Sequence, residues 1–99
     1  SKNQNITTII ALNDRMAIGA ISALEKMGKN VPHDISVVGY DDIPMASTSQ
    51  PALTTINQKP IELGRAAAEL MLKRLNNEKP TNVVISPSLV KRESLAIRR

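Results

Sequence analysis

Three short apolar segments, each followed by polar side chains, divide the first half of the chain. They cover residues 6–12, 35–40 and 53–56. Short runs rich in β-branched residues are typical of strands that are buried on both faces, and such strands form parallel sheets covered by helices. The pattern therefore predicts an α/β fold, with a parallel sheet flanked by helices.

Helical spacing of apolar residues separates and follows these segments. It predicts one helix from about Asp14 to Met27, with Asn13 or Asp14 as its N-cap and Gly28 as its C-terminal stop. A second helix is predicted over residues 61–76, after Pro60. The first helix is apolar over more than one face, which indicates a contact surface beyond its own sheet.

The remaining segments are less regular. Residues 43–52 are rich in serine, threonine and proline and are expected to form a loop with one turn of helix. Two short strands are expected near the end of the chain, over residues 82–86 and 89–92, with a bend at Pro87.

The ends of the three predicted strands supply the candidate site. Ligands of open parallel sheets bind outside the carboxyl ends of the strands, and there the chain has Asn13, Asp41 and Gln58. Each has an alternative role: Asp41 could cap the following turn, Asn13 could cap the first helix, and Gln58 could simply precede the second. For Asp42, the neighbour of Asp41, capping of the turn is the expected role.

Composition excludes several kinds of chemistry. The 99 residues are 41% apolar, enough for one small domain, and contain no cysteine, one histidine and one aromatic residue, Tyr40. Disulfides and thiolate metal sites are thereby excluded, and His33 has no partner at metal-binding spacing. The sequence has no Gly-rich phosphate loop and no serine-nucleophile motif. We therefore expect no enzyme, no metal site and no cofactor.

The net charge of +4 is unevenly distributed. Residues 1–49 carry four basic and five acidic residues, whereas residues 50–99 carry nine basic and four acidic ones. The basic residues of the second helix alternate with glutamates, which favours a solvated face over a nucleic-acid surface. No apolar stretch is long enough to span a membrane, and no contact with a membrane is expected.

One alternative uses the two adjacent carboxylates. Asp41 and Asp42 could hold Mg²⁺, as in phospho-accepting receiver domains, which are also doubly wound. That alternative needs another acidic residue and a lysine at the ends of further strands, and no suitable lysine follows residues 53–56.

Several motifs, in order, resemble the LacI/GalR family of bacterial transcription regulators. They are Ala-Leu-Asn-Asp-Arg-Met-Ala-Ile-Gly-Ala at 11–20, Val-Pro-His-Asp-Ile-Ser-Val-Val-Gly-Tyr-Asp-Asp at 31–42, Pro-Ala-Leu-Thr-Thr-Ile at 51–56, Gln58, Leu-Gly-Arg-Ala-Ala at 63–67 and Ser-Leu-Val-Lys-Arg-Glu-Ser at 88–94. Because the motifs keep the family's order and spacing, the resemblance covers nearly the whole chain.

The resemblance implies a cytoplasmic repressor whose two-lobed core is similar to type I periplasmic binding proteins. Residues 1–99 match the C-terminal part of that core, without the DNA-binding headpiece and without the N-terminal part. The implied partners are a small-molecule effector, a sugar or related metabolite, and a second copy of the chain. Operator DNA would be bound only through the absent headpiece. A fragment of a periplasmic sugar-binding protein is the alternative, although the ending at 89–94 is similar to that of the repressors.

The resemblance also implies roles for individual residues. Asp41, Asn13 and Gln58 match positions at the effector pocket. Positions that match the dimer surface are Met16, Ala17, Ile18, Ala20, Pro44, Met45 and Ser49. The helix from Ile61 is expected to pack on the lobe that is outside this chain.

Overall fold

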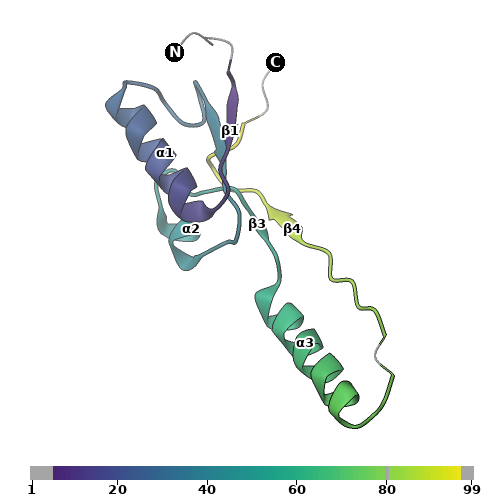
Figure 1. Cartoon of the computed structure of the whole chain (residues 1–99). Coiled ribbons are helices and arrows are strands. Elements are labelled where there is room, and N and C mark those ends of the chain that lie inside the picture. Colours follow the sequence, from purple (N-terminus) through teal and green to yellow (C-terminus); the bar gives the residue numbers. More distant parts are fainter. Residues whose placement is uncertain (1–5, 80, 97–99) are drawn as a thin grey trace.

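The computed structural model describes residues 6–79 and 81–96, which form a body with a projecting arm (Figure 1). The elements are β1 (Thr8–Ile10), α1 (Asp14–Lys26), β2 (Ser36–Val38), α2 (Pro44–Thr48), β3 (Thr55–Asn57), α3 (Pro60–Leu75) and β4 (Ser88–Val90). The body contains β1, α1, β2 and α2, and the arm contains α3 and residues 76–79 and 81–87. The radius of gyration is 18.0 Å, against about 13 Å for a compact domain of this length. The molecule is therefore elongated.

A parallel sheet forms the centre of the body. β1 pairs in parallel with β2, with Ile9 opposite Val37. A parallel bridge between Val38 and Thr54 adds the start of a third strand on the other side of β2. These pairings confirm the predicted α/β class with a parallel sheet.

The core of the body lies between this sheet and α1. The apolar stripe of α1, formed by Ala17, Ile21 and Leu24, is buried against Val37 and Leu53, and Ala46 of α2 completes the cluster. Burial of a Val- or Leu-sized side chain contributes about 1.5–3 kcal/mol. This aliphatic cluster stabilises the packing of α1 on the sheet, and the sheet in turn fixes the positions of the strand ends.

The ends of α1 follow the sequence signals. The Asn13 side chain accepts a hydrogen bond from the Met16 N–H at 2.9 Å and is the N-cap. After the C-cap, Gly28 adopts a φ of +79°, a left-handed conformation that glycine adopts without steric cost. The predicted helix is confirmed, with its C-terminus one residue earlier.

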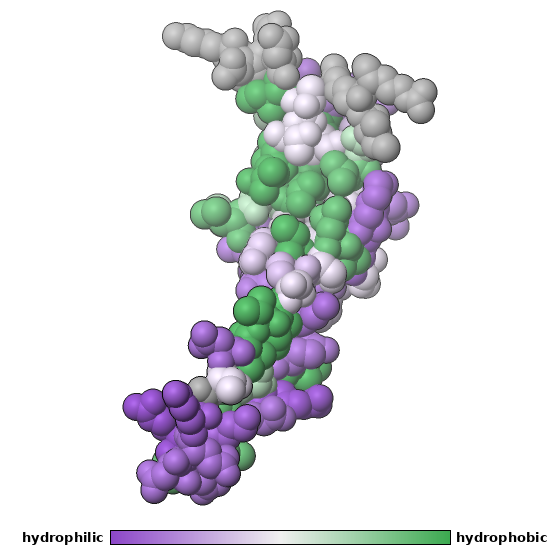
Figure 2. All heavy atoms as spheres, turned by 90° about the vertical axis from the view of Figure 1, so that its right-hand side faces the viewer, coloured by the Kyte–Doolittle hydropathy of each residue, from purple (hydrophilic) through white to green (hydrophobic). Residues whose placement is uncertain are grey.

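The arm is joined to the body by β3 and β4, which pair antiparallel with Ile56 opposite Leu89 (the β3–β4 ribbon). The helix α3 confirms the predicted second helix, but none of its residues is buried. Apolar residues on the described part of the arm that are largely exposed are Ile61, Leu63, Met71, Leu72, Leu75, Val83 and Val84. In Figure 2, apolar surface covers much of the body and continues onto the near part of the arm.

The two expected C-terminal strands are only partly present. The single strand there is β4 at Ser88–Val90, and residues 82–86 have no regular structure. A strand is stable only when a neighbouring strand satisfies its N–H and C=O groups, and the described residues place none beside 82–86. The prediction of a strand over residues 82–86 is therefore wrong, although the chain there is extended alongside α3 (Figure 1).

Candidate functional site

Three parallel segments end at one edge of the sheet: β1, β2, and the third segment, which starts at Thr54 and continues into β3. The polar residues that follow them lie side by side. The Asp14 N–H donates to the Tyr40 carbonyl at 3.1 Å, and the Asp41 N–H donates to the Ile56 carbonyl at 2.9 Å. These backbone bonds join the segment after β1, the segment after β2 and β3. The carboxyl edge of the sheet thus carries the polar side chains that sequence analysis assigned to it.

Asp41 and Gln58 are in direct contact at this edge. The Gln58 amide nitrogen Nε2 donates to Asp41 Oδ1 at 2.8 Å, while Asp41 itself remains exposed. The φ of Asp41 is +122°, a conformation that side-chain-bearing residues rarely adopt. Such strain, of about 1–3 kcal/mol, is typical of functional sites. The sequence did not indicate this positive φ, because glycine is the residue that usually marks such a position and residue 41 is an aspartate.

Asn13 lies at the same edge, but its side-chain oxygen is used by its own helix. That oxygen caps α1 through the Met16 N–H. The capping role, which the sequence left open, is therefore present. The amide NH₂ group of Asn13 still has two donors that a ligand could use.

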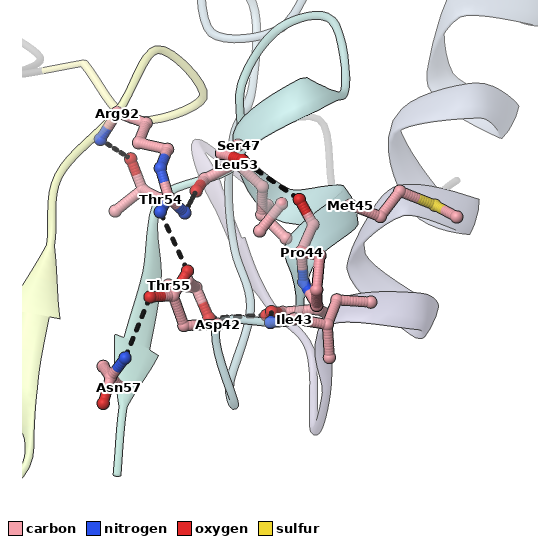
Figure 3. A network of polar contacts seen from close by, with 12 residues as sticks. Asp42, Ile43, Pro44, Met45, Ser47, Leu53, Thr54, Thr55, Asn57 and Arg92 are labelled. Atoms are coloured by element: carbon pink, nitrogen blue, oxygen red, sulfur yellow. Dashed lines mark hydrogen bonds and ion pairs between the residues drawn. The ribbon is translucent and has the colours of Figure 1, made fainter. Parts of the chain in front are cut away.

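Asp42 does not cap its turn, and that expectation is wrong. One carboxylate oxygen forms an ion pair with Arg92 Nη2 at 2.9 Å, and the other accepts a hydrogen bond from Asn57 Nδ2 at 2.9 Å (Figure 3). The hydrogen bond from Asn57, more than the Arg92 guanidinium, lowers the pKa of the Asp42 carboxyl, although partial burial opposes the shift. Both partners are distant in sequence, so the local pattern could not identify them.

Asp14 is a buried carboxylate that sequence analysis considered only as a helix cap. Its Oδ2 accepts the Ile43 N–H at 2.8 Å, and its Oδ1 accepts the Thr55 hydroxyl at 2.5 Å. It therefore connects α1 to the loop after Asp42 and to β3. Gly39 makes this possible, because a Cβ at that position would lie 2.3 Å from Asp14 Oδ1.

A hollow of about 240 Å³ lies beside Gln58, where the body meets the arm. Its lining residues are Tyr40, Gln58, Leu63, Ile85 and Pro87. Leu63, Ile85 and Pro87 were not predicted as site residues. They come from the arm, which the β3–β4 ribbon places next to the strand ends.

The magnesium alternative has no support in this geometry. Among residues 6–79 and 81–96, no three potential metal-ligating side chains are grouped closely enough to hold a metal ion. Asp42, one of its two proposed ligands, is already bound to Arg92. In the same ranges, the structure contains no helix with the length and apolarity required to cross a bilayer.

The residues expected at a dimer surface lie on α1, on α2 and just after α2. Met16 and Met45 are 53% and 49% exposed, Pro44 is exposed, and Ile18, Ala20 and Ser49 are half-buried. Ala17 has no exposed surface and belongs to the core. Its assignment to the dimer surface is therefore wrong, because α1 turns this residue toward β2.

Comparison with known proteins shows related chains. A family model described as a periplasmic binding protein-like domain matches residues 2–95. The HTH-type transcriptional repressor PurR of Haemophilus influenzae (strain PittEE) is 40% identical over 94 residues, which are 90% of this chain and 28% of that repressor.

Solved structures agree with that match. A LacI family transcriptional regulator from Arthrobacter sp. FB24 in complex with lactose has a TM-score of 0.82 and 36% identity, covering 92% of this chain and 36% of that one. The lac repressor dimer bound to operator and the anti-inducer ONPF has a TM-score of 0.83 and 39% identity, covering 89% and 27%. This chain thus spans about a third or less of the length of these relatives. Since the family model covers nearly all of it, the chain belongs to the periplasmic binding protein-like family, as a member of the LacI/GalR type.

Proposed function

We propose that this chain is the effector-sensing and dimerising part of a cytoplasmic transcription regulator and has no catalytic activity of its own. In this proposal, residues 1–99 are the C-terminal part of a two-lobed effector-binding core. A separate headpiece of the same regulator contacts the operator DNA. The relatives of known name are repressors, which supports a regulatory role over an enzymatic one.

The observation that carries the proposal is the contact between Asp41 and Gln58 at the carboxyl edge of the sheet. The carboxylate of Asp41 is exposed, and Gln58 holds one of its oxygens at 2.8 Å. A carboxylate fixed in this way can accept hydrogen bonds from hydroxyl or N–H groups of a ligand. Asn13, at the same edge, adds donors from its amide group.

A sugar or related polar metabolite is the proposed effector. Hydroxyl groups of a sugar would be bound by Asp41 and Gln58, while Tyr40 and the apolar residues of the neighbouring hollow would contact its less polar face. The Arthrobacter relative was solved with lactose, which supports this class of ligand.

The proposed dimer surface combines α1 and α2. Met16 and Met45 give it two long, exposed apolar side chains, and Ile18, Ala20, Pro44 and Ser49 extend it. Methionine adapts its shape to an apolar partner surface. The lac repressor relative was solved as a dimer, which supports a homodimer.

The test is calorimetry of the regulator that carries this chain, with lactose, cellobiose, D-galactose and D-ribose as probes. At least one sugar should bind, and Asp41→Asn should weaken its binding about tenfold or more. A hydrogen bond to a charged group contributes about 1.5–3 kcal/mol, and about 1.4 kcal/mol is a factor of ten in affinity. Folding should hardly change, because the amide keeps the shape of the carboxylate.

The matched control is Glu25→Gln, the same change from carboxylate to amide on an exposed position of α1. This variant should bind the sugar as the unmodified protein does. If none of the sugars binds, the proposed class of effector is wrong. If Asp41→Asn keeps its affinity but unfolds at a lower temperature, Asp41 only stabilises the turn.

A further inference from the structure

The backbone that carries Asp41 is held in an unfavourable conformation at two consecutive residues. Asp41 has a φ of +122° and Asp42 a φ of +60°, and neither is a glycine. Conformations of this kind persist only where surrounding contacts determine them. The contacts of residues 41 and 42 therefore decide how the Asp41 carboxylate is presented.

The side chain of Asp42 has such contacts on both oxygens. Arg92 Nη2 contacts Oδ1 at 2.9 Å, and Asn57 Nδ2 donates to Oδ2 at 2.9 Å. Figure 3 shows the Asp42 carboxylate with Arg92 above it and Asn57 below it. A carboxylate with both oxygens bound cannot rotate without breaking an interaction.

Arg92 is itself fixed by further bonds. Its Nη1 donates to the Leu53 carbonyl at 2.9 Å, and its backbone N–H donates to the Thr54 hydroxyl at 2.8 Å. The guanidinium thus bridges the start of the third parallel segment and the loop after β2. A lysine, with a single ammonium group, lacks the planar fork that serves both partners.

We infer that Arg92 is a positioning residue for the effector site, which acts through Asp42 to hold residues 41 and 42 in the conformation that presents Asp41 to the ligand. This inference rests on the proposed function for the role of Asp41. The effect of Arg92 on the conformation of residues 41 and 42 does not depend on a ligand, so it can be tested without one. Arg92 would affect effector binding without touching the effector.

Hydrogen–deuterium exchange of single amides in the 99-residue chain tests the inference. The reporter is the Asp41 N–H, which is bonded to the Ile56 carbonyl, and the reference is the Val37 N–H in the core. In Arg92→Met, exchange at Asp41 should be at least about tenfold faster, with little change at Val37. Lys91→Met, which removes the neighbouring exposed charge, is the matched control and should change neither amide.

Asp42→Gly is a second variant, which separates an effect on the conformation of residues 41 and 42 from an effect on the overall fold. Glycine adopts a φ of +60° without strain, so the fold should survive while the bonds to Arg92 and Asn57 are lost. Faster exchange at Asp41 alone, in both variants, supports the inference. Unchanged exchange at Asp41 in both, or equal acceleration at Asp41 and Val37, overturns it. Failure of all sugars to bind the regulator would refute the proposed class of effector but leave this result intact.

Discussion

At residue 39 the chain has no room for a side chain. A Cβ there would lie 2.3 Å from Asp14 Oδ1 and 2.9 Å from Leu53 Cδ2. Both neighbours are buried, and the Asp14 carboxylate is already held by Ile43 and Thr55. Neither group can move away without losing contacts in the body.

Gly39→Ala should therefore lower the free energy of unfolding by about 1–3 kcal/mol, the usual cost of overpacking. Thermal denaturation followed by circular dichroism measures the change. The matched control is Gly19→Ala in α1, where a Cβ would have nothing within 4 Å, and there stability should rise by about 0.5–1 kcal/mol. Equal effects of the two changes would show that the contact with Asp14 is not tight.

The Asp42 carboxylate should make stability depend on pH. Its pKa in the folded chain is below the ordinary value of 3.8. Its contribution is therefore fully present above that ordinary value and is lost as the pH falls through the lowered folded-state pKa. Urea denaturation of the unmodified chain and of Asp42→Asn should show a stability gap at pH 6 that closes as the pH falls well below 3.8. A gap of constant size would mean that the charge of Asp42 contributes nothing.

Among the elements, one buried serine adds a second set of hydrogen bonds to the backbone join between β2 and the third parallel segment. The Ser94 hydroxyl accepts the Thr54 N–H at 2.8 Å and donates to the Val37 carbonyl. The Val37 N–H in turn donates to the Ser94 carbonyl at 2.9 Å. The segment after β4 thus completes the sheet of the body from the far end of the chain.

Ser94→Ala should cost about 1–3 kcal/mol of unfolding free energy, because the Thr54 N–H would be left buried without a partner. Ser88→Ala, at an exposed position of β4, removes the same hydroxyl from a solvated site and should change stability by less than about 0.5 kcal/mol. Chemical denaturation of both variants makes the comparison. Similar small losses in the two would show that water replaces the Ser94 hydroxyl.

The elements of the body could be predicted from sequence because their signals are local. Apolar periodicity, the Asn13 cap and Gly28 together determine α1, and β-branched runs determine the parallel strands. The placement of Asp41 and Gln58 at one edge of the sheet was also expected, since parallel strands place their ends there, but their direct contact was not. The ion pair of Asp42 with Arg92 could not be predicted, because it joins residues fifty positions apart through a loop of unusual backbone conformation.

For the molecule as a whole, the exposed arm is the main departure from a compact domain. None of the residues of α3 is buried, whereas α1 buries Ala17, Ile21 and Leu24. Most of the stability of a helix in a protein comes from packing of its apolar face, and α3 buries no such face within the described chain. The sequence predicted the helix correctly, but a helical pattern does not reveal whether its apolar face has a partner.

Amide exchange should therefore distinguish the two helices. In the isolated 99-residue chain, amides in the middle of α3 should exchange at least about tenfold faster than those of α1, because local opening of α3 exposes no core. Mass spectrometry of peptic peptides resolves the two segments. Equal protection would mean that another surface, such as a second copy of the chain, covers α3 in solution.

The β3–β4 ribbon is only two strands wide, and this width limits how the arm can swing. A thin strip bends easily across its flat face and resists bending within its own plane. Any bending of the ribbon across its flat face therefore changes the distance between Tyr40, in the body, and Leu63 and Ile85, on the arm, which line the same hollow. A ligand that contacts both sides of the hollow would hold the arm at one angle to the body.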